Sequence, residues 1–253
     1  MIFYFSATGN SKYVASRISK ITGDEIIAID HCMKDQTLTF NAKENENIGI
    51  VVPVFTSALP TIVDDFLTKL KLTRDGKGYN FAVVTYGMNA GAADYYLKKS
   101  MENKSLPIDS LFSVKYPDSF APLFDVSNKK KVQKKVEAAE PKIDFVIDKI
   151  TNKVSGNFIK GKMPHVLAAL IHKVGYTNDR ITTKFTVSDS CNGCGICAEK
   201  CPTDAIKIKD NTPIWIKSHC VLCMGCLHRC PQNAIQYGNT KKHGQYLNPN
   251  ITV

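Results

Sequence analysis

The chain contains 253 residues, which is enough for one large domain or two modest ones. Hydrophobic residues make up 43% and charged residues 22%, an ordinary balance for a globular protein that excludes extended disorder and collagen-like repeats. The formal net charge is +10, but only four of the 33 basic residues are Arg. Because nucleic-acid readers rely on Arg forks, this Lys bias disfavours nucleic acid without excluding it, and we expect no nucleic-acid partner.

The sequence carries no membrane or export signal that we can identify. No apolar run is long enough to span a bilayer, and the opening residues MIFYF include neither a basic region nor a cleavage site. We therefore expect no membrane span and a cytoplasmic location, where thiols stay reduced and clustered cysteines usually bind metal. The oligomeric state is left open.

Residues 1–152 alternate apolar runs with helical periodicities. The apolar runs predict five strands, over Met1–Phe5, Glu25–Ile29, Asn47–Val54, Asn80–Tyr86 and Ile108–Val114. Helical spacing predicts helices over Ser11–Ile21, Pro60–Leu70, Ala92–Met101 and Asn128–Ile150, with Pro141 kinking or dividing the last. Strands alternating with helices indicate an α/β fold with a doubly wound parallel sheet.

Residues 153–183 differ in composition from the segments on either side. They hold five Lys or Arg residues against one Asp, and Val166–Val174 reads as a short apolar helix. We expect this helix to pack one domain against the other, and membrane contact is the less favoured alternative. The expected organisation is a domain over 1–152, a basic linker over 153–183, a cysteine-rich domain over 184–240 and a tail over 241–253, to which we assign no role.

The cysteine-rich part contains an internal repeat. Eight of the nine cysteines lie between Cys191 and Cys230. Seven residues recur after 29 positions: Cys191, Cys194, Cys197, Cys201, Pro202, Ala205 and Ile206 match Cys220, Cys223, Cys226, Cys230, Pro231, Ala234 and Ile235. Such a repeat implies two similar half-units related by a pseudo-twofold axis.

Each half-unit reads C-x2-C-x2-C-x3-C-P, a spacing typical of [4Fe–4S] clusters in which the fourth cysteine serves the other cluster. We therefore assign Cys191, Cys194, Cys197 and Cys230 to one cluster, and Cys220, Cys223, Cys226 and Cys201 to the other. Gly193, Gly195 and Gly225 are expected to let backbone amides approach the sulfurs. Structural zinc is the alternative, but zinc sites use two C-x2-C pairs with a longer gap. Residues Phe185–Tyr237 resemble bacterial-type ferredoxins with two [4Fe–4S] clusters.

The loop after the first strand is rich in small and hydroxylated residues, namely Ser6, Thr8, Gly9, Asn10 and Ser11. A strand–loop–helix of this kind offers backbone N–H groups and hydroxyls to a phosphate, although a capped helix start is the plain alternative. The loop resembles the FMN phosphate loop of flavodoxins, T/S-x-T-G-x-T, with Ser11 in place of the final Thr. No G-x-G-x-x-G follows a strand, so a mononucleotide fits better than a dinucleotide.

Two later strand ends should flank the flavin ring in such a fold. The first supplies Pro53, Phe55, Thr56, Ser57 and Ala58, and the second supplies Thr85, Tyr86, Gly87 and Asn89. Both lie at the carboxyl edge of the predicted sheet, where parallel α/β folds bind ligands. Phe55 and Tyr86 are candidates to border the ring, although aromatic residues are also common in cores.

Together the two parts resemble a family of flavodoxin–ferredoxin fusions found in anaerobes, sometimes called iron–sulfur flavoproteins. The resemblance implies FMN, two [4Fe–4S] clusters and electron transfer to a redox partner, for which we expect an acidic ferredoxin or flavodoxin docking near residues 153–183. The alternative is an FMN-dependent reductase of a quinone, nitro compound or similar acceptor, with Tyr116 and Phe120 near an open pocket. A third reading is a zinc-stabilised interaction module. Whether the chain acts on a substrate of its own is left open.

Overall fold

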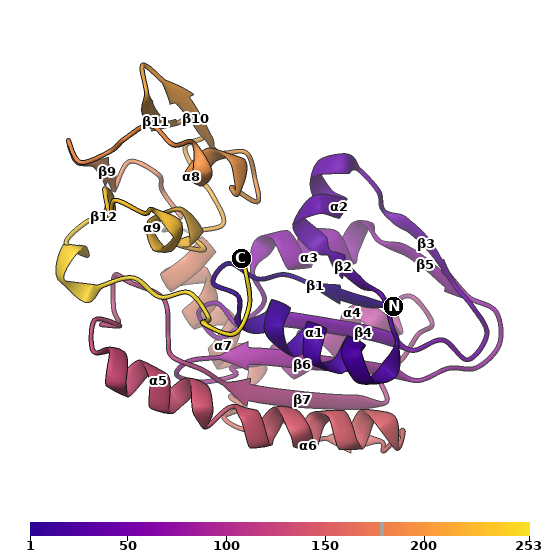
Figure 1. Cartoon of the computed structure of the whole chain (residues 1–253). Coiled ribbons are helices and arrows are strands. Elements are labelled where there is room, and N and C mark those ends of the chain that lie inside the picture. The colour runs from indigo at the N-terminus through magenta and orange to yellow at the C-terminus, as the bar shows by residue number, and fades with distance from the viewer. Residues whose placement is uncertain (178–179) are drawn as a thin grey trace.

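The computed structural model describes residues 1–177 and 180–253. Its centre is a parallel sheet with the strand order β2-β1-β4-β6-β7-β8 (Figure 1). The strands are β1 (Ile2–Tyr4), β2 (Ile26–Ala28), β4 (Ile48–Pro53), β6 (Asn80–Tyr86), β7 (Ser110–Lys115) and β8 (Gly156–Asn157). The five predicted strands and the parallel α/β fold are confirmed.

The predicted count of five strands is one too low, because β8 adds a sixth at the edge of the sheet. It is two residues long, and Phe158 N donates to Leu111 O at 2.7 Å just beyond it. A strand this short has too few residues to produce an alternating or apolar pattern, so hydrophobic periodicity could not predict it.

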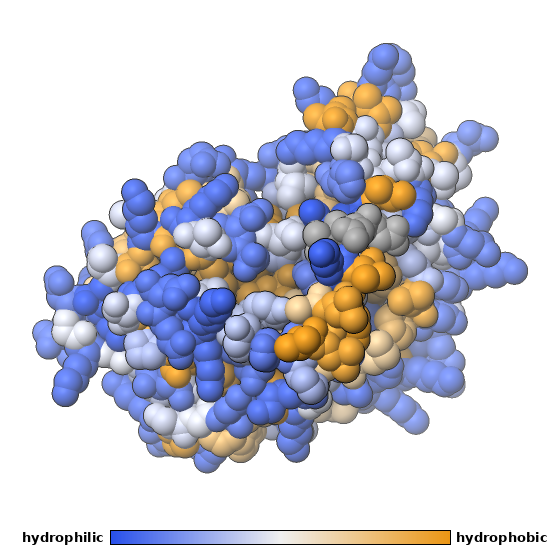
Figure 2. All heavy atoms as spheres, turned by 180° about the vertical axis from the view of Figure 1, so that it is seen from behind, coloured by the Kyte–Doolittle hydropathy of each residue, from blue (hydrophilic) through white to orange (hydrophobic). Residues whose placement is uncertain are grey.

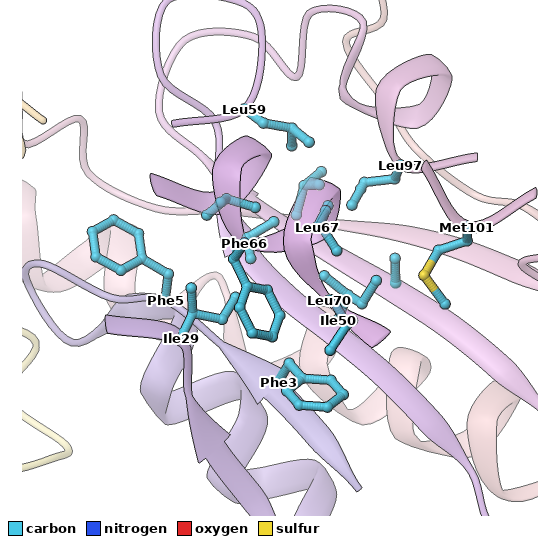
Figure 3. Close-up of a cluster of buried hydrophobic side chains, with 14 of the residues drawn as sticks. Phe3, Phe5, Ile29, Ile50, Leu59, Phe66, Leu67, Leu70, Leu97 and Met101 are labelled. Atoms are coloured by element: carbon cyan, nitrogen blue, oxygen red, sulfur yellow. The ribbon is translucent and has the colours of Figure 1, made fainter. Parts of the chain in front are cut away.

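Helices cover both faces of the sheet. They are α1 (Asn10–Thr22), α2 (Ile29–Asp35), α3 (Thr61–Lys69), α4 (Ala93–Glu102), α5 (Lys129–Glu137) and α6 (Glu140–Thr151). Phe3, Ile50 and Ala82 pack with α3 and α4 on one face, as Figure 3 shows for Phe3, Ile50, Phe66, Leu97 and Met101. Their strand neighbours Ile2, Val51 and Phe81 pack with α1 and α6 on the other. Alternate side chains of a strand point to opposite faces, so the fully apolar strands suit a doubly wound sheet.

The predicted helix over 128–150 is divided in two, as Pro141 suggested. Pro141 lies in the first turn of α6, where its missing N–H costs no helical hydrogen bond. Helix α2 and the small parallel pair of β3 (Thr39–Ala42) and β5 (Lys71–Arg74) were not predicted. These elements extend the first domain beyond the predicted core.

The cysteine-rich domain consists of short elements around its own core. Strand β9 (Phe185–Val187) pairs antiparallel with β12 (Ile235–Tyr237), and β10 (Ile206–Lys209) pairs with β11 (Thr212–Trp215). Helices α8 (Ile196–Glu199) and α9 (Gly225–Arg229) occupy equivalent places in the two half-units. Phe185 stacks on Trp215 with ring centroids 4.5 Å apart, which closes the core.

Helix α7 (His165–His172) packs by one face only. Ala168 is buried, and His172 Nδ1 donates to Phe55 O at 3.0 Å. The opposite face leaves Val166, Leu167 and Leu170 exposed, as is Val174 just beyond the helix, and Figure 2 shows an apolar patch on this side of the molecule. Across the described residues, no helix is both long and apolar enough to cross a membrane.

Candidate cofactor-binding sites

The loop between β1 and α1 forms a cradle at the carboxyl edge of the sheet. Gly9 has φ 95°, and its N–H donates to Ser6 Oγ at 3.1 Å. Helix α1 begins at Asn10, so its first N–H groups have no helical acceptor and carry the positive end of the helix dipole. Ser11 Oγ lies 2.8 Å from Thr85 Oγ1, which ties the loop to the end of β6.

A cavity of about 420 Å³ opens beside this cradle, and we call it the edge cavity. Twelve of the fourteen residues predicted for cofactor binding line it: Ser6, Thr8, Asn10, Ser11, Pro53, Phe55, Thr56, Ser57, Thr85, Tyr86, Gly87 and Asn89. Gly9 and Ala58 do not. Gly9 faces the C-terminal residues of the chain, and a Cβ there would lie 2.7 Å from the Val253 side chain. Ala58 closes the turn after β4 through its backbone bonds with Phe55.

The turn after β4 is strained. Phe55 N donates to Ala58 O at 2.9 Å and Ala58 N returns a bond to Phe55 O at 3.1 Å. Thr56 and Ser57 between them have φ 45° and 69°, a region that residues with a Cβ disfavour. Ala92 N fixes the turn by donating to Ser57 O at 2.9 Å, and Ser57 Oγ donates to Asn89 Oδ1 at 3.2 Å. Strain held in place beside a cavity suggests a binding function for the turn.

Several residues of the edge cavity were missing from the fourteen predicted for cofactor binding, although Tyr116 and Phe120 had been named as candidates near an open pocket. The loop after β7 adds Tyr116, Pro117, Asp118, Ser119, Phe120, Leu123 and Phe124; the linker adds Met163, Ile171, Gly175 and Tyr176; Val54, Met88, Leu222 and Met224 also contribute. The sequence offered one signal, since Tyr116-Pro117-Asp118 directly follows a strand at the same edge. Burial raises the pKa of Asp118 above its usual range.

The eight clustered cysteines surround two smaller cavities, four at each, and none forms a disulfide. One cavity is lined by Cys201, Cys220, Cys223 and Cys226, the inner set, so called because Cys223 also lines the edge cavity. The other is lined by Cys191, Cys194, Cys197 and Cys230, the outer set. This is the grouping that the crossed-ligand hypothesis requires.

The two half-units repeat each other in backbone detail. Ala205 N donates to Cys201 Sγ at 3.3 Å, and Ala234 N donates to Cys230 Sγ at the same distance. Gly193 and Gly195 have φ 70° and 78°, while the equivalent Leu222 and Met224 have φ 52° and 58°. The second half-unit therefore keeps the left-handed turns without glycine. A Cβ at Gly225 would lie 3.5 Å from Cys223 Sγ and would displace the end of the Arg229 side chain.

Comparison with protein families identifies the kind of domain that forms each part of the chain. A family model described as a flavodoxin domain matches residues 1–143, more than half of the chain. The chain belongs to the flavodoxin-domain family. A second model, described as a 4Fe-4S dicluster domain, matches residues 190–235, so the chain is a flavodoxin–ferredoxin fusion, as the resemblance implied. Both kinds of domain indicate electron transfer. A search of curated proteins found no match.

The cysteine sets of this fusion suit clusters better than a single ion. Among residues 1–177 and 180–253, no three His, Cys, Asp or Glu side chains converge closely enough to hold one metal ion. Zinc would draw four sulfurs to about 2.3 Å from one point, whereas each thiolate of a cubane binds a different iron. Burial raises the pKa of Cys197 to about 11 and of Cys223 to about 12, so buried thiolates here need a cationic core to stabilise them.

The edge cavity likewise fits FMN. The cradle supplies one anion site, and Phe55, Tyr86 and Phe120 supply aromatic walls for a ring. Tyr116 also lines the cavity, and its side chain is buried in the core that contains Tyr246 and residues of α1 and α6.

The two sites of the fusion meet at Leu222, Cys223 and Met224, which come from the cysteine-rich domain and line the edge cavity. Tyr176 lies between the domains, and its hydroxyl donates to Val221 O at 2.8 Å. Its ring contacts Phe55 with centroids 6.0 Å apart. One aromatic side chain thus joins the turn after β4 to the loop that carries Cys223.

Proposed function

We propose that this flavodoxin–ferredoxin fusion passes electrons between FMN in the edge cavity, a cluster on the inner set, a cluster on the outer set and a redox partner protein. The observation that carries the proposal is Cys223, which lines both the inner cavity and the edge cavity. Bound FMN would exchange one or two electrons, while each cluster exchanges one, so the protein can convert between electron pairs and single electrons.

The chain's own residues hold the sites at a fixed separation. Arg180 Nη1 donates to Cys220 O at 3.1 Å, and the Tyr176 hydroxyl holds the adjacent Val221. Leu222 and Met224 are buried between the inner set and the edge cavity, and they exclude water there. Such a device needs no nucleophile or acid–base pair from the protein.

Anaerobic purification with metal, sulfide and flavin analysis tests the proposal. We expect about eight iron and about eight sulfide per chain from the two four-cysteine sets, together with one FMN. The protein should be brown, with flavin bands beneath broad cluster absorption. A colourless protein loaded with zinc would contradict the proposal and favour the interaction module.

A second function, reduction of a small organic acceptor at the flavin, is favoured by the apolar rim of the edge cavity. Met88 and Leu123 line the cavity and are also exposed, which leaves an apolar entrance. A quinone or nitroaromatic compound suits such a rim. Saturable turnover that Leu123→Arg abolishes, with cluster and flavin content unchanged, would establish the reductase. Slow, non-saturable turnover would leave electron transfer to a protein as the function.

We further propose that the redox partner is acidic, such as a small ferredoxin or flavodoxin, and docks near residues 153–183. This segment holds five basic residues and one acidic residue. Lys160, Lys162 and Lys173 are exposed and precede or directly follow α7 in the chain, and Lys162 also pairs with Asp94 at 3.7 Å. Redox partners meet through small interfaces with charged rims, which this surface provides.

A further inference from the structure

Residues 243–253, which we call the strap, run from the cysteine-rich domain back to the start of the sheet (Figure 1). At the first end, Gln245 Nε2 donates to the carbonyls of Leu227 at 2.6 Å and Cys230 at 2.7 Å. Tyr246 N donates to His228 Nδ1 at 3.2 Å. These bonds attach the strap to helix α9 and to the end of the second half-unit.

At the other end, the strap is bonded to the cradle between β1 and α1. The Tyr246 hydroxyl donates to Asn10 Oδ1 at 2.6 Å, and Asn248 Nδ2 donates to the same oxygen at 3.1 Å. Asn248 N donates to Thr8 O at 2.8 Å. Tyr246 is 3% exposed and Asn248 is 2% exposed, so water does not compete for these bonds.

The two bonds to Asn10 decide which way its amide faces. A carboxamide has an accepting oxygen on one side and two N–H donors on the other. Because Tyr246 and Asn248 both donate to Oδ1, the NH₂ group of Asn10 is left to the edge cavity, which Asn10 lines. Among the described residues, that NH₂ group has no hydrogen-bond partner.

We infer that Tyr246 and Asn248 are positioning residues of the phosphate site. They hold the Asn10 amide with its donors toward an anion in the cradle, and Asn248 fixes the backbone of Thr8 beside it. Without them the amide could turn its oxygen toward the anion, which would repel it. The strap therefore confers selectivity for a flavin that carries a phosphate. This inference rests on the proposed FMN function.

The test measures FMN and riboflavin affinity in the flavin-depleted full chain with its clusters in place. We expect Tyr246→Phe, which removes one hydroxyl, to weaken FMN about five- to tenfold and to leave riboflavin unchanged. Asn248→Ala should act in the same direction. Tyr13→Phe is the matched control, because it removes a tyrosine hydroxyl of α1 that bonds to Glu140 and does not line the edge cavity.

A double-mutant cycle separates orientation from packing. In an Asn10→Ala background, Tyr246→Phe should cause no further loss of FMN affinity, because the amide that it orients is gone. If the wild type binds FMN and riboflavin equally, the proposed phosphate site is wrong. If the wild type prefers FMN but Tyr246→Phe and Asn248→Ala leave that preference unchanged, or weaken both flavins alike, the strap only packs against the loop and the inference is overturned.

Discussion

The two cysteine half-units share a backbone but have different surroundings. Both use the same left-handed turns and the same N–H···S bond to the fourth cysteine. The second half-unit packs against the flavodoxin domain, where Val221 joins the core that contains Phe3 and Phe66. In the first half-unit, Cys194 is exposed. The repeat sets the ligand geometry, and the neighbouring domain makes the two halves unequal.

This inequality bears on how each cluster behaves. Burial and hydrogen bonds to sulfur tune cluster potentials. The outer set lies beside the hairpin of β10 and β11, whose Ile208 and Ile214 are exposed. The inner set packs with Tyr176 in the core of its own domain. Two clusters with the same ligand set should therefore differ in potential and in contact with the flavin.

The largest expected effect comes from removing the fourth cysteine of each half-unit in turn. Cys201→Ala and Cys230→Ala should each lower iron from about eight to about four per chain, because each fourth ligand serves one cluster. Cys201→Ala should remove the inner cluster and abolish reduction of the flavin through the clusters. Cys230→Ala should remove the outer cluster and leave the inner cluster in contact with the flavin.

Electron paramagnetic resonance and flavin reduction kinetics distinguish the two variants. Cys32→Ala is the control, since Cys32 lies in the core of the flavodoxin domain and should leave the iron content unchanged. Loss of the cluster held by Cys220 in the Cys230 variant would show that the ligands do not cross.

The next effect is confined to the flavodoxin half. Gly91 has φ 57°, and a Cβ there would overlap the carbonyl of Ser57. Gly91→Ala should therefore displace the turn after β4, lower the free energy of unfolding by at least about 2 kcal/mol and abolish FMN binding. Iron content should stay unchanged.

Gly23→Ala is the matched control, since Gly23 has φ 76° and no neighbour within 4 Å. This variant should lower the free energy of unfolding by about 1 kcal/mol, which denaturant unfolding can measure. An unchanged flavin affinity in Gly91→Ala would show that this turn is not part of the site.

A smaller effect should come from Thr8→Ala in the cradle. A hydrogen bond to a charged group contributes roughly 1.5–3 kcal/mol, so FMN should bind about tenfold or more weakly. Riboflavin lacks the phosphate and should bind wild type and variant alike, which fluorescence titration can measure. An equal loss for both flavins would mean that Thr8 supports the loop without contacting a phosphate.

The sequence was most informative where the chemistry is local. The cysteine spacing and the loop from Ser6 to Ser11 each lie within a short stretch, so residue type and spacing could predict which residues line the cavities. The rest of the edge cavity is assembled from segments far apart, and Tyr246 meets Asn10 across 236 residues. The left-handed Thr56 and Ser57 gave no signal because glycine normally marks such turns. The short strand β8 depends on pairing with β7, which periodicity does not report.

The smallest expected effect decides which half a partner meets. Lys160 and Lys162 lie before α7 and contact the flavodoxin domain at Ser113 and Asp94, while Lys207 and Lys209 lie on β10, whose Ile208 lines the outer cavity. Charge steering is screened by salt, so electron transfer with an acidic partner should slow several-fold between about 0.01 and 0.15 M ionic strength.

Reversing Lys160 and Lys162 to Glu should lower the association rate, measured by stopped flow, more than it lowers the rate of the electron-transfer step. Reversing Lys207 and Lys209 makes the same charge change elsewhere and should have little effect. If that second pair alone slows association, the partner docks at the outer half and our assignment of its surface is wrong. If neither pair nor salt matters, these lysines only keep the surface solvated.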